Sequence, residues 1–408
     1  MEQFKWVGQG GLMSGTIVLG LGDNIDYEIR WDSAVLEALI RRYAIKNGEL
    51  SQEIEIAGER ALAVSILRFL RDEKGGECFV HAPRIIEDFS QYFTKRVTLG
   101  GTSVRAAIAM HKIGFASSVH LVTMNPYVRE LLPEDCRYIC SADEERIYPH
   151  LIVQYYEGTT VDADDIHIRT KRANRIIYVN DPDNMLMKLS PQLGDLIADA
   201  GVFLISGFNA MQDRPLLESR LDELNRAMRK LSADAQVFYE DGCFHIPEFS
   251  QVVRQKLLHR INIYSLNEDE FQSYIGRSVA LLDAPAVLAA LPDLYRRIPV
   301  PVLVIHTRYW ALAYGDNACE YGNALKGGIT MAGTRFRFGD DFSMSDYQAT
   351  ETSPLQEPGL RFSETINASG AGKVCCLACV QAEESSATTI GLGDAFVGGF
   401  IPRLQQSA

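Results

Sequence analysis

A glycine-rich stretch near the C-terminus carries the residues best suited to chemistry, and residues 388–396 read TTIGLGDAF. Two glycines separated by one residue, followed by an acid and an apolar run, are typical of a tight loop that opens a helix. Such a loop points backbone N–H groups at one spot, and the helix dipole adds partial positive charge there. The N–H groups of Gly391 and Gly393 could stabilise a transferring phosphoryl group while Asp394 accepts a hydroxyl proton. The alternative is an ordinary helix N-terminus with an acidic first turn.

A second polar stretch follows a predicted strand close to the N-terminus. Residues 15–22 (GTIVLGLG) form a β-branched run that ends in glycines, a pattern typical of a buried parallel strand. A dinucleotide-binding fingerprint is not formed, because Ile25 occupies the position of its third glycine. Asn24 and Asp26 follow the strand, and open α/β sheets bind ligands at the carboxyl ends of their strands. We therefore predict a polar ligand site here, with a simple polar turn as the alternative.

Further polar residues come at the ends of later predicted strands. From about residue 195 onward, strand-like and helix-like segments alternate, which predicts a parallel sheet with helices on both faces. Glu240 and Glu270 end two of these segments, and we expect them to converge with Asp394 at one edge of the sheet. Mg²⁺ prefers oxygen ligands and keeps several waters, so two or three carboxylates, partly through water, would hold it. The alternative is a set of solvated acids at strand ends.

The elements that must position these residues form two predicted parts within one unit, residues 1–408. Strand-like runs at 118–122, 151–156 and 176–179, separated by polar turns, predict a small antiparallel sheet that covers the site as a lid. Helices are predicted at 33–44, capped by Asp32 or Ser33, and at 59–72, and a long surface loop at 333–358. The predicted lid comprises approximately residues 23–34, 79–98 and 117–185, and the large α/β domain comprises the rest, mainly 99–116 and 186–408.

The composition of the chain limits the classes of molecule that it is expected to bind. The chain has 408 residues, 47% of them hydrophobic and 23% charged, and a net charge of −13. This charge argues against a nucleic-acid or anionic-membrane surface, so an anionic substrate needs a local basic cluster, for which Lys171, Arg172 and Arg175 are available. No apolar run is long enough to span a membrane, and no signal peptide is recognised, so a cytoplasmic location is expected. The eight cysteines form no disulfide framework, and the C-x-x-C at 376–379 favours a buried strand over zinc.

The segment from Thr389 to Asp394 resembles the Thr-x-Gly-x-Gly-Asp motif of the ADP-dependent phosphofructokinase/glucokinase branch of the ribokinase-like sugar kinases. The resemblance implies a ribokinase-like parallel sheet flanked by helices, with a smaller β-rich lid. Relatives usually carry an amide where this chain has Thr102, and a histidine where it has Phe238. The sites that the resemblance implies are catalytic Asp394, Gly391, Leu392 and Gly393; substrate-binding Asn24, Asp26, Glu87, Gly100, Gly101, Thr102 and Arg175; nucleotide-binding Asn209, Asn267, His306, Thr307 and Thr389; and metal-binding Glu240, Glu270 and Asp394.

The reaction implied by the resemblance is Mg²⁺-dependent transfer of a phosphoryl group from ADP to a hexose phosphate such as fructose 6-phosphate. An arginine at the position of Arg175 would bind the sugar phosphate, because a planar guanidinium can make two parallel hydrogen bonds to it. The alternatives are an ADP-dependent glucokinase, an ATP-dependent ribokinase-like kinase and a catalytically idle sugar-binding regulator. The partners expected are a small-molecule sugar and a nucleotide.

Overall fold

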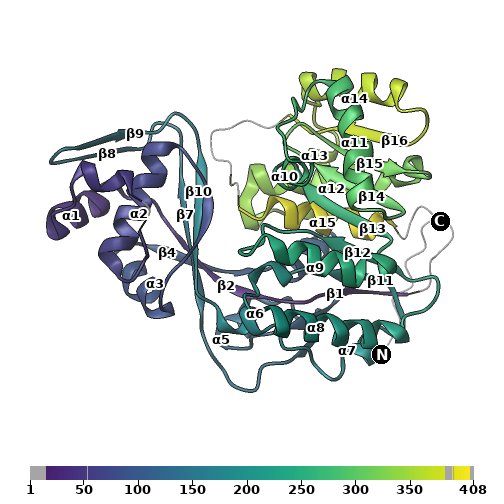
Figure 1. Cartoon of the computed structure of the whole chain (residues 1–408), viewed down its shortest axis with the longest axis horizontal. Coiled ribbons are helices and arrows are strands. Elements are labelled where there is room, and N and C mark those ends of the chain that lie inside the picture. The colour runs from purple at the N-terminus through teal and green to yellow at the C-terminus, as the bar shows by residue number, and fades with distance from the viewer. Residues whose placement is uncertain (1–14, 53, 382–387, 389, 405–408) are drawn as a thin grey trace.

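A nine-stranded sheet with helices on both faces organises the larger part of the chain (Figure 1). The computed structural model describes residues 15–52, 54–381, 388 and 390–404. The pairings from β6 through β14 are parallel, and those of β15 with β14 and β16 are antiparallel. In spatial order the strands are β16 (Val374–Ala378), β15 (Trp310–Gly315), β14 (Val302–His306), β13 (Ile263–Asn267), β12 (Gln236–Glu240), β11 (Ala200–Ile205), β1 (Thr16–Leu19), β5 (Ser118–Leu121) and β6 (Arg137–Cys140).

Successive residues of each strand enter the cores on opposite faces of this sheet, as strand geometry requires. On β12, Phe238 packs against Phe400 with ring centroids 5.5 Å apart, whereas Tyr239 packs against Tyr264 at 4.8 Å in the other core. Both faces are therefore covered, and the strands read as nearly continuous apolar runs. One face carries α4 (Thr102–Lys112), α12 (Gly322–Phe338) and α15 (Leu392–Leu404); the other carries α7 (Leu193–Ile197), α8 (Arg214–Ala227), α9 (Glu248–Leu257), α10 (Glu268–Ile275), α11 (Ala284–Arg297) and α14 (Glu357–Ser369).

A mixed five-stranded sheet forms the smaller part, and Figure 1 shows α1 to α3 on its side away from the large sheet. β2–β4 and β7–β10 pair antiparallel, whereas β2–β7 and β3–β10 pair in parallel. The strands are β3 (Gly76–Phe79), β10 (Asn174–Val179), β7 (Pro149–Tyr155), β2 (Asn24–Ile29) and β4 (Lys95–Gly100), and the accompanying elements are α1 (Ser33–Tyr43), α2 (Glu59–Asp72), α3 (Pro83–Ser90) and the hairpin β8 (Thr160–Ala163) with β9 (Ile166–Arg169).

Shorter elements connect these layers. The remaining helices are α5 (Pro126–Leu131), α6 (Pro182–Leu186) and α13 (Met344–Glu351), and the 3₁₀ turns are η1 (Asn47–Ser51), η2 (Phe208–Ala210), η3 (Met228–Lys230), η4 (Leu258–Arg260), η5 (Ala318–Tyr321) and η6 (Gly339–Asp341).

The predicted α/β fold, with a large parallel-rich sheet flanked by helices, is confirmed. The two predicted early helices are present, and the Asp32 carboxylate caps α1 by accepting a hydrogen bond from the Ala34 N–H at 2.9 Å. The predicted long loop at 333–358 is wrong. α12 continues to Phe338, and α13 begins at Met344 after the N-cap Ser343, which forms a capping box with Asp346.

The predicted limits of the lid differ from the observed small sheet. β5 and β6 fall within 117–185, yet they pair with β1 in the nine-stranded sheet. Conversely α2 and all of β3 except Phe79 fall outside the predicted lid segments, yet they belong to the small part. The sheet is also mixed rather than antiparallel, because β2 and β7 pair in parallel. The limits of each sheet depend on which strands pair, and the paired strands lie far apart in the sequence. Local sequence patterns carry no information on these pairings.

Candidate active site

The loop that opens α15 carries Asp394 in the first helical turn. Gly391 has a positive φ of 62°, a conformation in which glycine is favoured because it has no Cβ. Asp394 Oδ1 accepts a hydrogen bond from Thr102 Oγ1 at 2.8 Å, and the Asp394 side chain is 23% exposed. The predicted glycine loop that opens a helix with Asp394 in its first turn is therefore present, and the carboxylate is partly accessible.

Close helix packing fixes the direction of α15. A Cβ at Gly399 would lie 2.2 Å from the carbonyl oxygen of Gly327 on α12, and one at Gly398 would lie 2.9 Å from Ala109 Cβ on α4. Only glycine permits these approaches, so both neighbouring helices hold α15 at short range. The small residues that follow Asp394 thus position the carboxylate by packing.

Asn24 and Asp26 lie on β2, where the small sheet meets the large one. Asn24 is paired with Gly100 of β4 and donates a hydrogen bond from Nδ2 to Asp26 Oδ1 at 2.6 Å. A Cβ at Gly100 would lie 2.3 Å from Asn24 Nδ2, so this position requires glycine. Gly101 has a φ of 88° and precedes α4. The predicted cluster of Asn24, Asp26 and the paired glycines is therefore assembled.

Arg105, which was not predicted from the sequence, links this cluster to Asp394. Its Nη2 lies 2.6 Å from Asp26 Oδ2, and its Nε lies 3.8 Å from Asp394 Oδ2. Burial opposes the charge of the guanidinium, but the surrounding carboxylates, Asp26 first, outweigh burial and raise the pKa of Arg105 above its ordinary value. An arginine among the apolar residues of the 104–113 helix was the signal that could have revealed it.

Arg175 on β10 faces the same region. Burial lowers the pKa of Arg175, and the charge of Asp394 acts in the opposite direction, which places the guanidinium near that carboxylate. Lys171 and Arg172 do not join it, since the backbone N–H of Lys171 donates to Glu73 and Arg172 Nε lies 3.7 Å from Glu73. Of the predicted basic cluster, only Arg175 faces Asp394.

Three neighbouring parallel strands end beside the start of α15. Glu240 closes β12 and His306 closes β14, and Glu240 Oε1 lies 3.0 Å from His306 Nε2. The His306 ring stacks on Phe396 with centroids 4.8 Å apart. A Cβ at Gly393 would lie 3.4 Å from His306 Cε1 and 3.9 Å from Glu240 Oε1. Of the carboxylates predicted to converge with Asp394, Glu240 thus lies beside the glycine loop, together with His306.

Glu270 sits one strand away, on α10 after β13. Asn267 caps this helix, and Glu270 Oε2 accepts the Asn267 N–H at 2.8 Å. Burial, with the nearby charges of Asp241 and Glu240, raises the pKa of Glu270 to about 8. Burial also raises the pKa of Asp241 to about 6, although two tyrosine hydroxyls donate to it. Asp241 was not predicted from the sequence, although it follows Glu240 directly.

Among the described residues, no three His, Cys, Asp or Glu side chains are arranged so that they could hold a metal ion together. The predicted set of Glu240, Glu270 and Asp394 therefore does not form a complete direct ligand shell. Glu240 Oε2 is nevertheless buried and has no hydrogen-bond partner among these residues. A buried, unpartnered carboxylate oxygen is costly, so this edge of the sheet suits a cation.

Some of the other predicted site residues contact only their own surroundings and make no hydrogen bond or ion pair with Asp394 among the described residues. Glu87 is on α3, where its charge acts on Tyr27 and Lys95. Thr307 Oγ1 donates to the Trp310 carbonyl at 2.9 Å within the turn between β14 and β15. Asn209 follows β11 and donates to the Cys243 carbonyl at 3.4 Å. Thr389 lies outside the described residues.

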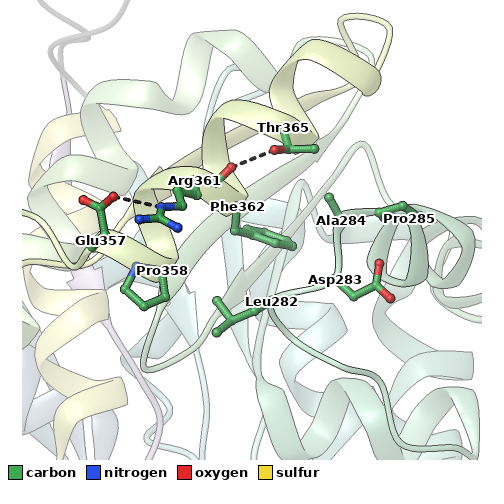
Figure 2. Close-up of a pocket in the computed structure, with 9 residues that line it drawn as sticks. All are labelled: Leu282, Asp283, Ala284, Pro285, Glu357, Pro358, Arg361, Phe362 and Thr365. Carbon is green, nitrogen blue, oxygen red and sulfur yellow. Dashed lines mark hydrogen bonds and ion pairs between the residues drawn. The ribbon is translucent and has the colours of Figure 1, made fainter.

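A separate hollow of about 670 Å³ lies between the start of α11 and α14 (Figure 2). Phe362, on its wall, stacks on Trp310 with ring centroids 4.9 Å apart. Arg361 also lines the hollow and pairs with Glu357 at 2.8 Å. None of the predicted site residues lines this hollow, so its volume alone does not mark it as the reaction site.

Comparison with known proteins identifies the family. Residues 15–399 match the profile described as the ADP-specific Phosphofructokinase/Glucokinase conserved region. The chain belongs to this family. Its members are ADP-dependent sugar kinases, so the predicted enzyme class, phosphotransferase, is confirmed, and family membership implies ADP as the phosphoryl donor. No curated protein matches the chain in a sequence search.

Solved structures described as phosphofructokinases or ADP-dependent kinases share this fold. A phosphofructokinase from Pyrococcus horikoshii OT3 with AMP is 16% identical, with 96% of this chain and 98% of that chain covered and a TM-score of 0.74. The last common ancestor of ADP-dependent phosphofructokinases from Methanosarcinales is 13% identical, with 97% and 94% covered and a TM-score of 0.72. An ADP-dependent kinase in complex with fructose-6-phosphate and ADPbetaS is 12% identical, with 97% and 95% covered and a TM-score of 0.72.

None of the helices in the described ranges is long and apolar enough to cross a bilayer.

Proposed function

We propose that this family member transfers the terminal phosphoryl group of ADP to a hydroxyl of a hexose phosphate such as fructose 6-phosphate. The observation that carries the choice of acceptor is Arg175, a partly buried arginine of β10 whose guanidinium is close enough to Asp394 to feel its charge. Within the described residues its guanidinium makes no hydrogen bond, so its donors remain free for a ligand phosphate. A similar ADP-dependent kinase was solved with fructose-6-phosphate, which supports the same acceptor here.

In the proposed reaction, Asn24 and Asp26 bind sugar hydroxyls and present one of them to Asp394. Asp394 accepts the hydroxyl proton as the oxygen attacks phosphorus, which is general base catalysis. The N–H groups of Gly391, Leu392 and Gly393 stabilise the negative charge of the transferring group. The proposed roles require these residues to surround one acceptor, and the short links between Asp26, Arg105 and Asp394 support this.

We further propose that Mg²⁺ is bound near Glu240 and Glu270, where it would neutralise phosphate charge. The unpartnered Glu240 Oε2 and the raised pKa of Glu270 support this, because a cation would relieve both. Partial coordination through water is consistent with the chemistry of Mg²⁺, which keeps several of its waters.

The small sheet, with α1 to α3, is proposed to act as the lid over the site. It supplies Asn24, Asp26 and Arg175, whereas the larger part supplies Asp394 from α15 and Glu240 from β12. Movement of one part against the other would open the site to substrates and close it against water, which otherwise competes as acceptor.

The test is a phosphoryl-transfer screen with ADP, ATP and CDP as donors and with glucose and fructose 6-phosphate as acceptors. We expect the highest kcat/KM for ADP with fructose 6-phosphate. A preference for free glucose would replace the acceptor with that of a glucokinase, and a preference for ATP would overturn the donor. Sugar binding by calorimetry without turnover for any pair would indicate an idle sugar-binding regulator.

A further inference from the structure

Arg105 is a buried cation at the junction of the two parts of the chain. It lies on α4 and is 6% exposed, next to the buried residues Val104 and Ala106. A charge at such a place is stable only when opposite charges surround it. Arg105 therefore requires neighbouring carboxylates to stay charged, and the residues that supply them indicate its role.

The neighbours come from both parts. On the small sheet, Arg105 Nη2 lies 2.6 Å from Asp26 Oδ2 and 3.4 Å from Glu28 Oε1. On the large part, its Nε lies 3.8 Å from Asp394 Oδ2, and its Nη1 lies 3.9 Å from Asp340 Oδ1. One planar group thus donates a hydrogen bond to the acid proposed to bind the sugar and lies within ion-pair distance of the acid proposed to accept the proton.

Arg105 also supports the glycine loop. A Cβ at Gly391 would lie 3.0 Å from both Arg105 Cδ and Nη1, so the loop backbone rests directly on the guanidinium. The loop carbonyl of Ile390 accepts a hydrogen bond from Arg335 Nε at 2.7 Å, and Arg335 pairs with Asp340. Two buried arginines, Arg105 and Arg335, therefore support the loop, and the Asp340 carboxylate lies between them and offsets their mutual repulsion.

We propose that Arg105 is a positioning residue that sets the separation and orientation of Asp26 and Asp394, and so aligns the acceptor hydroxyl with its base. The inference rests on the phosphoryl transfer proposed above. The fork of a guanidinium bonds in fixed directions, whereas the ammonium of a lysine is a single point charge. Arg105→Lys would keep the positive charge that the buried carboxylates require but could not hold both acids in register.

The chain offers a matched control in Arg96. This arginine on β4 also bridges the two parts, with Nη2 3.0 Å from Asp341 Oδ1 and Nη1 3.9 Å from Asp340 Oδ2. Its partners include neither the proposed sugar-binding acid nor the proposed base. Arg96→Lys therefore tests whether a bridging guanidinium as such, rather than its contact with Asp26 and Asp394, matters to turnover.

The experiment compares wild type, Arg105→Lys and Arg96→Lys with ADP and fructose 6-phosphate, and records kcat, KM, ADP binding by calorimetry and thermal unfolding. A misplacement of about 1 Å can reduce turnover by about 10²-fold. We expect Arg105→Lys to lose kcat on this scale with unchanged ADP affinity. Hydrolysis of ADP, measured as inorganic phosphate formed for each sugar phosphorylated, should increase. Arg96→Lys should retain kcat. Asp340→Asn, which leaves Arg105 in place but loosens its hold, should give an intermediate kcat and serves if Arg105→Lys does not fold.

Wild-type kcat in folded Arg105→Lys and in Asp340→Asn would overturn the inference, as would an equal loss in Arg96→Lys. These results differ from failure of the proposed function. In that case the wild type itself would transfer no phosphoryl group from ADP to fructose 6-phosphate or glucose.

Discussion

Thr102 Oγ1 donates a hydrogen bond to Asp394 Oδ1 at 2.8 Å, from the first residue of α4 to the first turn of α15. Relatives were expected to carry an amide at this position, and the threonine looked like a departure. In this chain the hydroxyl orients the carboxylate that is proposed to act as base. The other carboxylate oxygen, Oδ2, faces Arg105, so both oxygens of Asp394 have a neighbour that limits their orientation.

Removing that hydroxyl without changing the shape of the side chain should reduce turnover. Hydrogen bonds to charged groups contribute about 1.5–3 kcal/mol, so Thr102→Val should lower kcat by about 10–100-fold. Thr102→Ser keeps the hydroxyl and is expected to stay within about threefold of wild type, a margin well below that bond energy. Steady-state kinetics with ADP and fructose 6-phosphate measure both. Equal activities of the valine and serine variants would show that the bond does not orient Asp394.

Asp394→Asn retains size and hydrogen bonding but cannot accept a proton. General acid–base catalysis contributes about 10²–10⁴-fold, so kcat should fall on that scale. ADP binding, measured by calorimetry, should change little, because the loop N–H groups remain. A variant with near wild-type turnover would remove Asp394 from the mechanism.

The metal proposal predicts a change in Mg²⁺ dependence. Glu240→Gln and Glu270→Gln each remove one negative charge near the metal, and the Mg²⁺ concentration for half-maximal activity should rise by about 10-fold or more, the scale seen when groups around a metal are changed. Glu248→Gln removes the same charge from an exposed position on α9 and serves as the control. If all three variants match the wild-type titration, the converging carboxylates do not bind the metal.

Asp23 predicts how stability depends on pH. Burial raises its pKa to about 8, although the Val122 and Thr123 N–H groups donate to Oδ1 at 2.7 and 3.0 Å. The folded state therefore holds this proton more tightly than the unfolded chain, whose aspartates have a pKa near 3.8. Stability from this group is complete below about pH 4 and is lost as pH rises toward 8, by up to about 1.4 kcal/mol per pH unit.

Asp23→Asn keeps the acceptor oxygen and removes the titration. The difference in unfolding free energy between wild type and variant, measured by urea denaturation at pH 5 and pH 8, should therefore shift in favour of the variant at the higher pH. A difference that stays constant with pH would show that Asp23 does not titrate in this range.

The parts of the site that sequence patterns predicted are those in which a local motif is itself the structure. The Gly391-x-Gly393-Asp394 loop opens a helix because its residue types specify a turn and a helix start. Asn24 and Asp26 follow a strand whose apolar pattern was clear. In each case residues adjacent in the sequence are enough to specify the local structure, so the prediction and the observed structure agree.

What the sequence could not predict depends on contacts between distant residues. The guanidinium of Arg105 meets Asp26, Asp340 and Asp394, which are separated from it by up to 289 positions. The predicted basic cluster separated because Arg172 turns to Glu73 of another element, while Arg175 on β10 faces the site. Neither outcome follows from charge spacing, because tertiary packing selects the partner of each side chain.

The two arginines at that divided cluster give the most specific test of the acceptor. If Arg175 binds a sugar phosphate, Arg175→Ala should weaken fructose 6-phosphate by about 2–3 kcal/mol, a factor of about 30–150, the upper range for charged hydrogen bonds. Free glucose has no phosphate, so its KM should hardly change. Arg172→Ala removes an equal charge three residues away, from an exposed side chain 3.7 Å from Glu73, and should leave both acceptors unaffected. The measurement is KM for each acceptor in wild type and both variants at saturating ADP. Equal impairment of glucose and fructose 6-phosphate in Arg175→Ala would reject the phosphate contact, and a wild type that prefers glucose would replace the sugar-phosphate kinase with a glucokinase.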